Sequence, residues 1–158
     1  MANPTPTDEQ QIYREYLDAV GLHGLAGAQA VGLHPTEWYA VSLISLEGAI
    51  TSGELATRTG LTTGATTRLI DRLERAGYVR RGADPADRRR VMVEPVHTSY
   101  AEIDDVVDPA RGRIAEVLAR YTPEQRALLF DYFAHAAPAF RAAAEELRTA
   151  ANTDGSRG

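Results

Sequence analysis

The chain has 158 residues, 44% of them hydrophobic, and a net charge of −5, which fits a single globular domain with a sizeable core. It contains no cysteine, which excludes disulfides, thiolate zinc sites and thiol-based redox switches. No apolar run reaches the roughly 18 residues of a membrane span. The polar start MANPTPTDEQ has no apolar signal core, so a cytoplasmic protein is the simplest interpretation.

Charge is unevenly distributed along the chain. All 17 basic residues are Arg, and residues 58–90 contain nine of them against four of the 22 acidic residues. That segment therefore carries about +5, whereas the rest, with eight Arg and 18 acids, carries −10. A basic island in an acidic protein favours a polyanionic partner. For a charge run taken alone, a merely solvated face is the alternative.

The first third of the chain predicts two helices. We expect flexible tails at residues 1–7 and 152–158, which are rich in Pro, Thr, Asn, Asp, Gly and Ser. From residue 8 to about residue 29 apolar side chains recur at helical spacing, although three glycines weaken the second half. A second helix should open at residues 34–37, with Pro35 at its first position, and stop near Gly48.

Residues 51–77 have the pattern of a helix-turn-helix. Thr51 and Glu54 fit a capping box that begins a short helix, which should end at Gly60. Thr62 is a good N-cap for the next helix, and Gly77 is a suitable stop. The apolar stripe of that helix is expected at Ala65, Leu69, Leu73 and Ala76. Its opposite face carries Thr63, Thr67, Arg68, Asp71, Arg72 and Arg75.

A β-hairpin pattern follows, and then more helix. Residues 78–81 and 91–94 read as short strands on either side of a turn-rich, charged segment at 82–90. Residues 98–107 predict a helix that Asp108-Pro109 interrupts and can restart. Thr122-Pro123 begins a last helix, which Pro138 should kink.

These elements together predict a mainly α fold with a small β-hairpin wing. Residues 33–96 would form a winged helix-turn-helix lobe within a single domain at 8–150. In such lobes the second helix of the motif lies in the DNA major groove, and arginines near a wing tip suit the minor groove. The expected DNA contacts are Thr62, Thr63, Thr67, Arg68, Arg72, Arg88 and Arg89. As an alternative, Thr63 and Thr67 are only cap and surface residues.

The flanking helices, at 8–30 and 98–150, are amphipathic and need a partner for their apolar stripes. They can pack on each other or on a second copy of the chain. Both together would give a two-fold dimer on a palindromic operator in double-stranded DNA, with half-sites about 34 Å apart.

Several of these segments resemble the MarR family of bacterial transcriptional regulators. The resemblance extends over roughly residues 8–150. The residues that carry it are Gly53–Ala56, Gly60–Thr62, Thr67–Glu74, Gly77–Val79 and, above all, Asp84-Pro85-Ala86-Asp87-Arg88-Arg89. The last segment is similar to the family's wing signature. Glu94–His97 departs from the usual Leu-Thr entry to the following helix, and Asp108-Pro109 also departs from the pattern.

The resemblance implies a homodimeric repressor whose terminal helices interlock. It implies recognition by the helix near residues 62–76 and minor-groove contact through Arg88 or Arg89, with Asp71 and Asp87 as supports for the wing arginine. It also implies a small, often aromatic or anionic, ligand that modulates DNA affinity. The expected lining of its cleft is Tyr16, His23, Trp38 and Tyr39.

Other interpretations compete with these. Trp38 at helical spacing with Val41 can be a core residue instead of a ligand contact. The four histidines show no metal-ligand spacing, and we expect no metal and no cofactor. No catalytic constellation or phosphate loop is visible, so the sequence does not predict an enzyme. The alternative function is a protein-interaction module that keeps the dimeric winged-helix fold without binding DNA.

Overall fold

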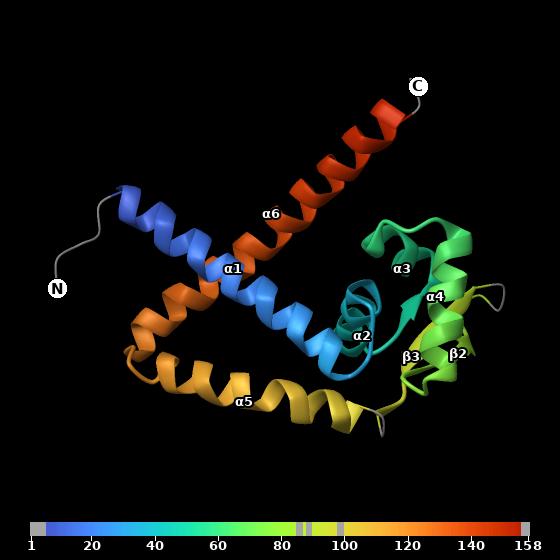
Figure 1. Cartoon of the computed structure of the whole chain (residues 1–158), viewed down its shortest axis with the longest axis horizontal. Helices are drawn as coiled ribbons and strands as arrows, with labels where there is room; N and C mark the ends of the chain where they lie inside the picture. Colours follow the sequence, from blue (N-terminus) through green and yellow to red (C-terminus); the bar gives the residue numbers. More distant parts are fainter. Residues whose placement is uncertain (1–5, 85–86, 88–89, 98–99, 156–158) are drawn as a thin grey trace. The chain divides into compact units, whose positions relative to one another are not determined.

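The computed structural model describes residues 6–84, 87, 90–97 and 100–155. Nine elements follow one another in this part of the chain (Figure 1). They are α1 (Pro6–Ala30), α2 (Pro35–Glu47), β1 (Ile50–Thr51), α3 (Ser52–Thr59), α4 (Thr63–Arg75), β2 (Val79–Ala83), β3 (Val91–Pro95), α5 (Tyr100–Leu118) and α6 (Pro123–Gly155). The mainly helical class with a small β-wing is confirmed. Two compact units divide the chain, Met1–Val107 and Asp108–Gly158.

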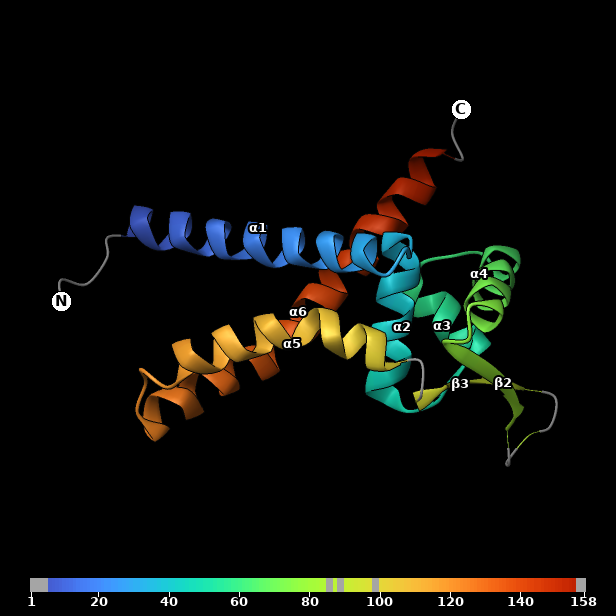
Figure 2. The same cartoon turned by 60° about the horizontal axis from the view of Figure 1, so that its bottom comes forward.

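The sheet has three antiparallel strands in the order β1-β3-β2, and β2 and β3 form the hairpin seen in Figure 2. Val79 pairs with Pro95 and Ala83 with Val91. The two-residue β1 was not expected, because a strand this short has no periodicity. It pairs through Ile50 with Val93, and both of these side chains are buried.

In the helix-turn-helix, the end of α4 and the start of α3 are capped by the residues that the sequence indicates. Beyond α4 the N–H of Gly77 donates to Glu74 O and the N–H of Tyr78 to Leu73 O, at 3.0 and 2.9 Å. This is a Schellman motif, which requires a left-handed residue, and Gly77 has φ 82°. The hydroxyl of Thr51 accepts the N–H of Glu54, so the Thr51 half of the expected capping box of α3 is confirmed.

One hydrophobic core holds the lobe together. Its buried members come from α2, α3, α4, the three strands, the residue before β2 and the first residue of α5. They are Ala40, Val41, Leu43, Ile44, Ile50, Leu55, Leu69, Ile70, Leu73, Tyr78, Val79, Val93 and Tyr100. On α4 the buried stripe is Thr66, Leu69, Ile70 and Leu73. The expected stripe was therefore displaced, since Ala76 is exposed and Ala65 only partly buried.

The expected interruption at Asp108-Pro109 is wrong, because α5 continues through Pro109. A proline in a helix loses one backbone hydrogen bond, to the residue four positions earlier. Here that residue, Asp105, is exposed, so water can satisfy its carbonyl. The carboxylate of Asp108 does not begin a new helix but accepts from Arg111 Nη1 at 2.8 Å. Helix α6 includes Pro138 without an interruption, and the kink expected there stays a prediction.

The long helices also extend into segments that were expected to be tails. Helix α1 already includes residues 6 and 7, and α6 continues to Gly155. In the described part of the chain no helix is long and apolar enough to cross a membrane.

Helices α1 and α2 meet through a glycine and a tryptophan. A Cβ atom added to Gly27 would lie 2.8 Å from Trp38 Cζ2, which is closer than real Cβ contacts. Glycine at this position therefore lets the indole lie directly on the α1 backbone. Trp38 is thus a packing residue, as the alternative interpretation held.

Candidate nucleic-acid interface

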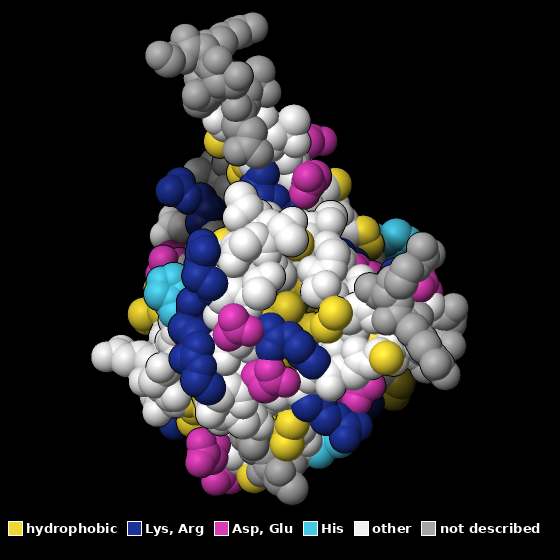
Figure 3. Space-filling model, turned by 90° about the vertical axis from the view of Figure 1, so that its right-hand side faces the viewer, with side chains coloured by type: hydrophobic (Ala, Val, Ile, Leu, Met, Phe, Trp, Pro, Cys, Tyr) yellow, Lys and Arg dark blue, Asp and Glu magenta, His cyan; other side chains and the backbone are white. Residues whose placement is uncertain are grey.

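Helix α4 presents a polar, largely arginine-bearing side to solvent. Thr63, Gly64, Thr67, Arg68, Arg72 and Arg75 are all exposed along it. The buried side of the same helix is anchored in the core by Leu69 and Leu73. Figure 3 looks onto this side of the molecule and shows arginine side chains following one another in a band. Such a surface can approach a polyanion without disturbing the core.

The threonines at the start of α4 have local roles as well. The hydroxyl of Thr62 caps the helix by accepting Ala65 N–H at 3.3 Å. The Thr67 hydroxyl donates to Thr63 O at 3.0 Å, which leaves its oxygen able to accept. Arg68 lies close by, since a Cβ on Gly64 would be 3.9 Å from Arg68 Nη1.

Arg72, expected among the DNA contacts, is bonded within the protein. Its Nε donates to Glu37 Oε1 on α2 at 2.5 Å. Its side chain is nevertheless about half exposed, at 51%, whereas that of Glu37 is at 11%. No local sequence pattern indicates this pair, because its members lie 35 residues apart.

Asp71 bonds Arg81 of β2, while the wing arginines that it was expected to support lie outside the described residues. Nη2 of Arg81 donates to Asp71 Oδ1 at 2.5 Å, and Nη1 pairs with Glu74 Oε2. The backbone N–H of Arg81 also donates to Glu74 Oε1 at 3.1 Å. Burial by itself lowers the pKa of Arg81, but the bonds to the two carboxylates more than compensate and raise it. Two acids of α4 therefore fix β2 through the side chain of Arg81.

The wing tip is described only in part. Arg88 and Arg89 lie outside the described residues. Asp87, expected as their support, accepts the backbone N–H of Arg90 at 2.9 Å through its carbonyl oxygen. Arg90 Nη1 lies 3.6 Å from Asp84 Oδ2. The described residues of the segment that carries the wing signature, Asp84, Asp87 and Arg90, are thus bonded to one another through Arg90.

The four residues expected to line a ligand cleft lie on α1 and α2. Tyr16 and Tyr39 are about half exposed, His23 is exposed, and Trp38 is partly buried against Gly27. Three hollows of the described surface lie elsewhere: on the N-terminal part of α1, beside the start of α3, and beside the end of β3. In the described residues no group of three or more His, Asp or Glu is arranged to hold a metal ion.

The chain is similar to known proteins in a family profile, in sequence and in fold. The profile of the MarR family matches residues 31–90. The chain is 38% identical over 138 residues to YcgE, an HTH-type transcriptional regulator of Bacillus subtilis, covering 87% of this chain and 90% of YcgE.

Two solved structures share the fold. NadR in complex with 4-hydroxyphenylacetate is 24% identical with a TM-score of 0.61, covering 87% of this chain and 96% of NadR. Sco3205, a MarR family transcriptional regulator from Streptomyces coelicolor in complex with DNA, is 23% identical with a TM-score of 0.54. That match covers 87% of this chain and 94% of Sco3205.

Proposed function

Because the chain belongs to the MarR family of transcriptional regulators, we propose that it is a homodimeric repressor that binds a palindromic operator in double-stranded DNA. A small aromatic or anionic ligand would modulate its DNA affinity. The observation that carries this proposal is the exposed arginine side of α4, held on one flank by Glu37 and on the other by Arg81.

On DNA, α4 would lie in the major groove. Thr63 and Thr67 would approach base edges or phosphates, while Arg68 would contact guanine or phosphate, for which a forked guanidinium is suited. Thr62 would add a contact at the start of the helix, and Arg88 and Arg89 of the wing would enter the minor groove. Asp87 would support these wing arginines. Sco3205, which shares this fold, was solved in complex with DNA, and this supports DNA as the partner.

The homodimer is supported by apolar surface on the terminal helices. Exposed fractions are 50% at Phe140, 39% at Phe133 and 73% at Leu147, which recur on one side of α6. Helix α1 adds Ile12, which is 57% exposed, and Val20, which is 50% exposed. Large apolar side chains left exposed on a helix in this way are typical of an interface, and a second copy of the chain can cover each helix with symmetric contacts.

The ligand proposal rests on the aromatic side chains of α1 and α2 and on the 4-hydroxyphenylacetate bound by NadR. Tyr16, His23 and Tyr39 are accessible, and Trp38 lies against Gly27 at the α1–α2 contact. A ligand that binds better to a dimer with unsuitable helix spacing would lower operator affinity by that difference in binding.

The deciding experiment is fluorescence anisotropy with DNA duplexes from the region upstream of the protein's own gene, repeated across a salt series. A random-sequence library provides selected sites if those duplexes fail. We expect sequence-selective binding and a steep negative dependence on salt, because arginine contacts release counterions from DNA. Arg68→Gln should reduce both affinity and salt dependence, whereas Arg141→Gln on α6 serves as a matched control. Weak binding without sequence preference, even after selection, would favour the interaction module.

A further inference from the structure

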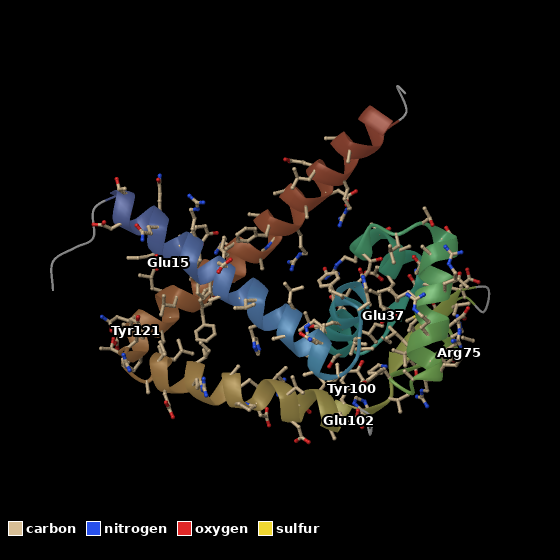
Figure 4. The ribbon with its side chains drawn as sticks, in the orientation of Figure 1. Glu15, Glu37, Arg75, Tyr100, Glu102 and Tyr121 are labelled. Carbon is tan, nitrogen blue, oxygen red and sulfur yellow. The ribbon has the colours of Figure 1, made fainter. Side chains whose placement is uncertain are left out.

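Glu37 is unusual because it is an acidic residue in the lobe with 8% exposure. Burying a carboxylate is costly unless it is hydrogen-bonded and paired. Both of its oxygens are used. Oε2 accepts the backbone N–H of His34 at 2.9 Å, which completes the capping box of α2, and Oε1 accepts Nε of Arg72 at 2.5 Å. The same side chain therefore fixes the start of α2 and binds α4 (Figure 4).

The environment of Glu37 favours its ionised form. Burial by itself raises the pKa of its carboxyl group, but the hydrogen bonds from Arg72 and from the His34 backbone, with the charge of Arg72, lower that pKa below its ordinary value. At neutral pH the pair is therefore a charge-assisted bond, which is shorter and stronger than a neutral one.

Arg72 lies on a flank of α4, not at the centre of its exposed side. Successive residues in a helix are separated by about 100°, so Arg68 and Arg75 project within about 30° of the direction opposite the whole buried stripe, whereas Arg72 is turned about 70° away from that direction, toward α2. The buried stripe consists of Thr66, Leu69, Ile70 and Leu73. The opposite flank carries Asp71 and Glu74, which bind Arg81 of β2. Ion pairs thus bracket α4 on both sides.

Rotation of α4 is the motion that these brackets oppose. Side-chain tips lie about 6 Å from a helix axis, so a rotation of about 20° displaces them by about 2 Å. Hydrogen bonds to base edges tolerate much less than that. A small loss of orientation would therefore weaken selective contacts before it weakens general attraction to phosphates.

We propose that Glu37 and Arg72 form a positioning pair that sets the orientation of α4, so that Arg72 supports sequence selectivity through Glu37 and not as a base or phosphate contact. The inference rests on the proposed function, in which α4 binds DNA, and it assigns Arg72 a different role from the one expected from the sequence. Arg68 and Arg75 are then the arginines of α4 left to contact DNA.

The test compares Glu37→Gln, Arg72→Gln and the double variant in the anisotropy assay, on an operator and on random duplex. Glutamine keeps the shape of Glu37 but has one oxygen for two donors, the His34 N–H and the Arg72 Nε–H. We expect each single variant to lose roughly tenfold or more in operator affinity, equivalent to about 1.4 kcal/mol. The double variant should lose no more than either single variant, and binding to random duplex should hardly change.

Salt dependence separates positioning from direct contact. Loss of a phosphate contact in each half-site would reduce the salt slope by about 2 per dimer, and Arg75→Gln is the matched variant in which we expect such a reduction. Arg72→Gln should keep the unmodified slope. A reduced slope in Arg72→Gln, together with unchanged or tighter binding in Glu37→Gln, would overturn the inference.

Glu37→Gln changes a buried residue and could impair folding. Arg72→Lys avoids this problem, because the Arg72 side chain is half exposed. Lysine keeps the positive charge but lacks the guanidinium edge, so we expect it to behave like Arg72→Gln, whereas a phosphate contact would survive the change. Full operator affinity in Arg72→Lys would contradict the positioning role. If the unmodified protein shows no sequence-selective binding, the proposed function fails and this inference with it; selective binding that both variants retain overturns the inference alone.

Discussion

The winged helix-turn-helix lobe and the terminal helices differ in how far their apolar side chains are buried within one chain. The lobe, built from α2, α3, α4 and the sheet, closes a core in which Ile44, Leu55 and Val93 have no exposed surface. In α6, by contrast, every described side chain from residue 123 to residue 151 is partly or fully exposed. The hydrophobic core of the lobe is complete within one chain, whereas the apolar sides of the terminal helices would be covered only in the proposed dimer. Stability should therefore come from the lobe and oligomeric state from the helices.

The largest effect is expected from truncation in the lobe core. Leu69→Ala should lower the free energy of unfolding by about 2–5 kcal/mol, because a buried leucine leaves a cavity and Leu69 is 1% exposed. Leu128→Ala on α6, where the side chain is 70% exposed, should cost less than about 0.5 kcal/mol. Denaturant unfolding measures both. Equal losses would contradict the division of roles between lobe and helices.

The strength of the proposed dimer should depend on α6 and not on the lobe core. Phe140→Glu is expected to weaken the dimer by about 2 kcal/mol or more, since buried aromatic residues dominate interfaces, while the lobe remains folded. Ala142→Glu, which adds the same charge on the other side of α6, is the control. Sedimentation equilibrium gives the association state, and circular dichroism confirms folding. A dimer unaffected by Phe140→Glu would remove this side of α6 from the interface.

The start of α5 belongs energetically to the lobe, and high pH should reveal it. Burial raises the pKa of Tyr100 to about 12, and its hydroxyl donates to Val41 O at 3.4 Å. A raised pKa means that this contribution is complete below pH 10 and is lost as the pH rises through 12. The contribution is on the order of 2–3 kcal/mol. Unfolding curves across this range should show the loss, and Tyr100→Phe should flatten it; an equally steep loss in that variant would assign the effect to other groups.

The contact between α1 and α2 can be tested with two glycines. Gly27→Ala should destabilise the protein by about 1–3 kcal/mol, as overpacking does, because the new Cβ would meet Trp38. Gly24→Ala has open space around it and should instead stabilise α1 by about 0.5–1 kcal/mol. Trp38, the single tryptophan, reports the change by fluorescence. Two variants with the same sign would contradict the packing seen here.

The smallest effect is expected at the hairpin. Arg81→Ala removes bonds to Asp71 and Glu74 and should cost about 1–2 kcal/mol, moderated by solvent because its side chain is 31% exposed. Arg80→Ala breaks a pair with Glu94 in which the arginine is 70% exposed, and should cost about 0–1 kcal/mol. Hydrogen exchange of the β2 amides measures how firmly the strand is held. Equal exchange in both variants would show that Arg81 does not fix β2.

Sequence by itself determined the features that depend on neighbouring residues. The order of the elements, the caps at Thr51 and Thr62, the stop at Gly77 and the basic island follow from spacings of a few residues, and these spacings also carried the resemblance to the MarR family. Helix starts and stops are local hydrogen-bonding events, so local patterns predict them.

Tertiary structure decided what depends on distant partners. Strand β1 exists because Ile50 finds Val93. Arg72 was expected to contact DNA, but only the fold brings it to Glu37, 35 residues away. Asp71 was expected to support an arginine of the wing. Its bond to Arg81 forms because α4 packs against β2. Helix α5 continues through Pro109 because its neighbouring turns and the surrounding water tolerate the lost bond, a balance that a local rule for proline does not contain.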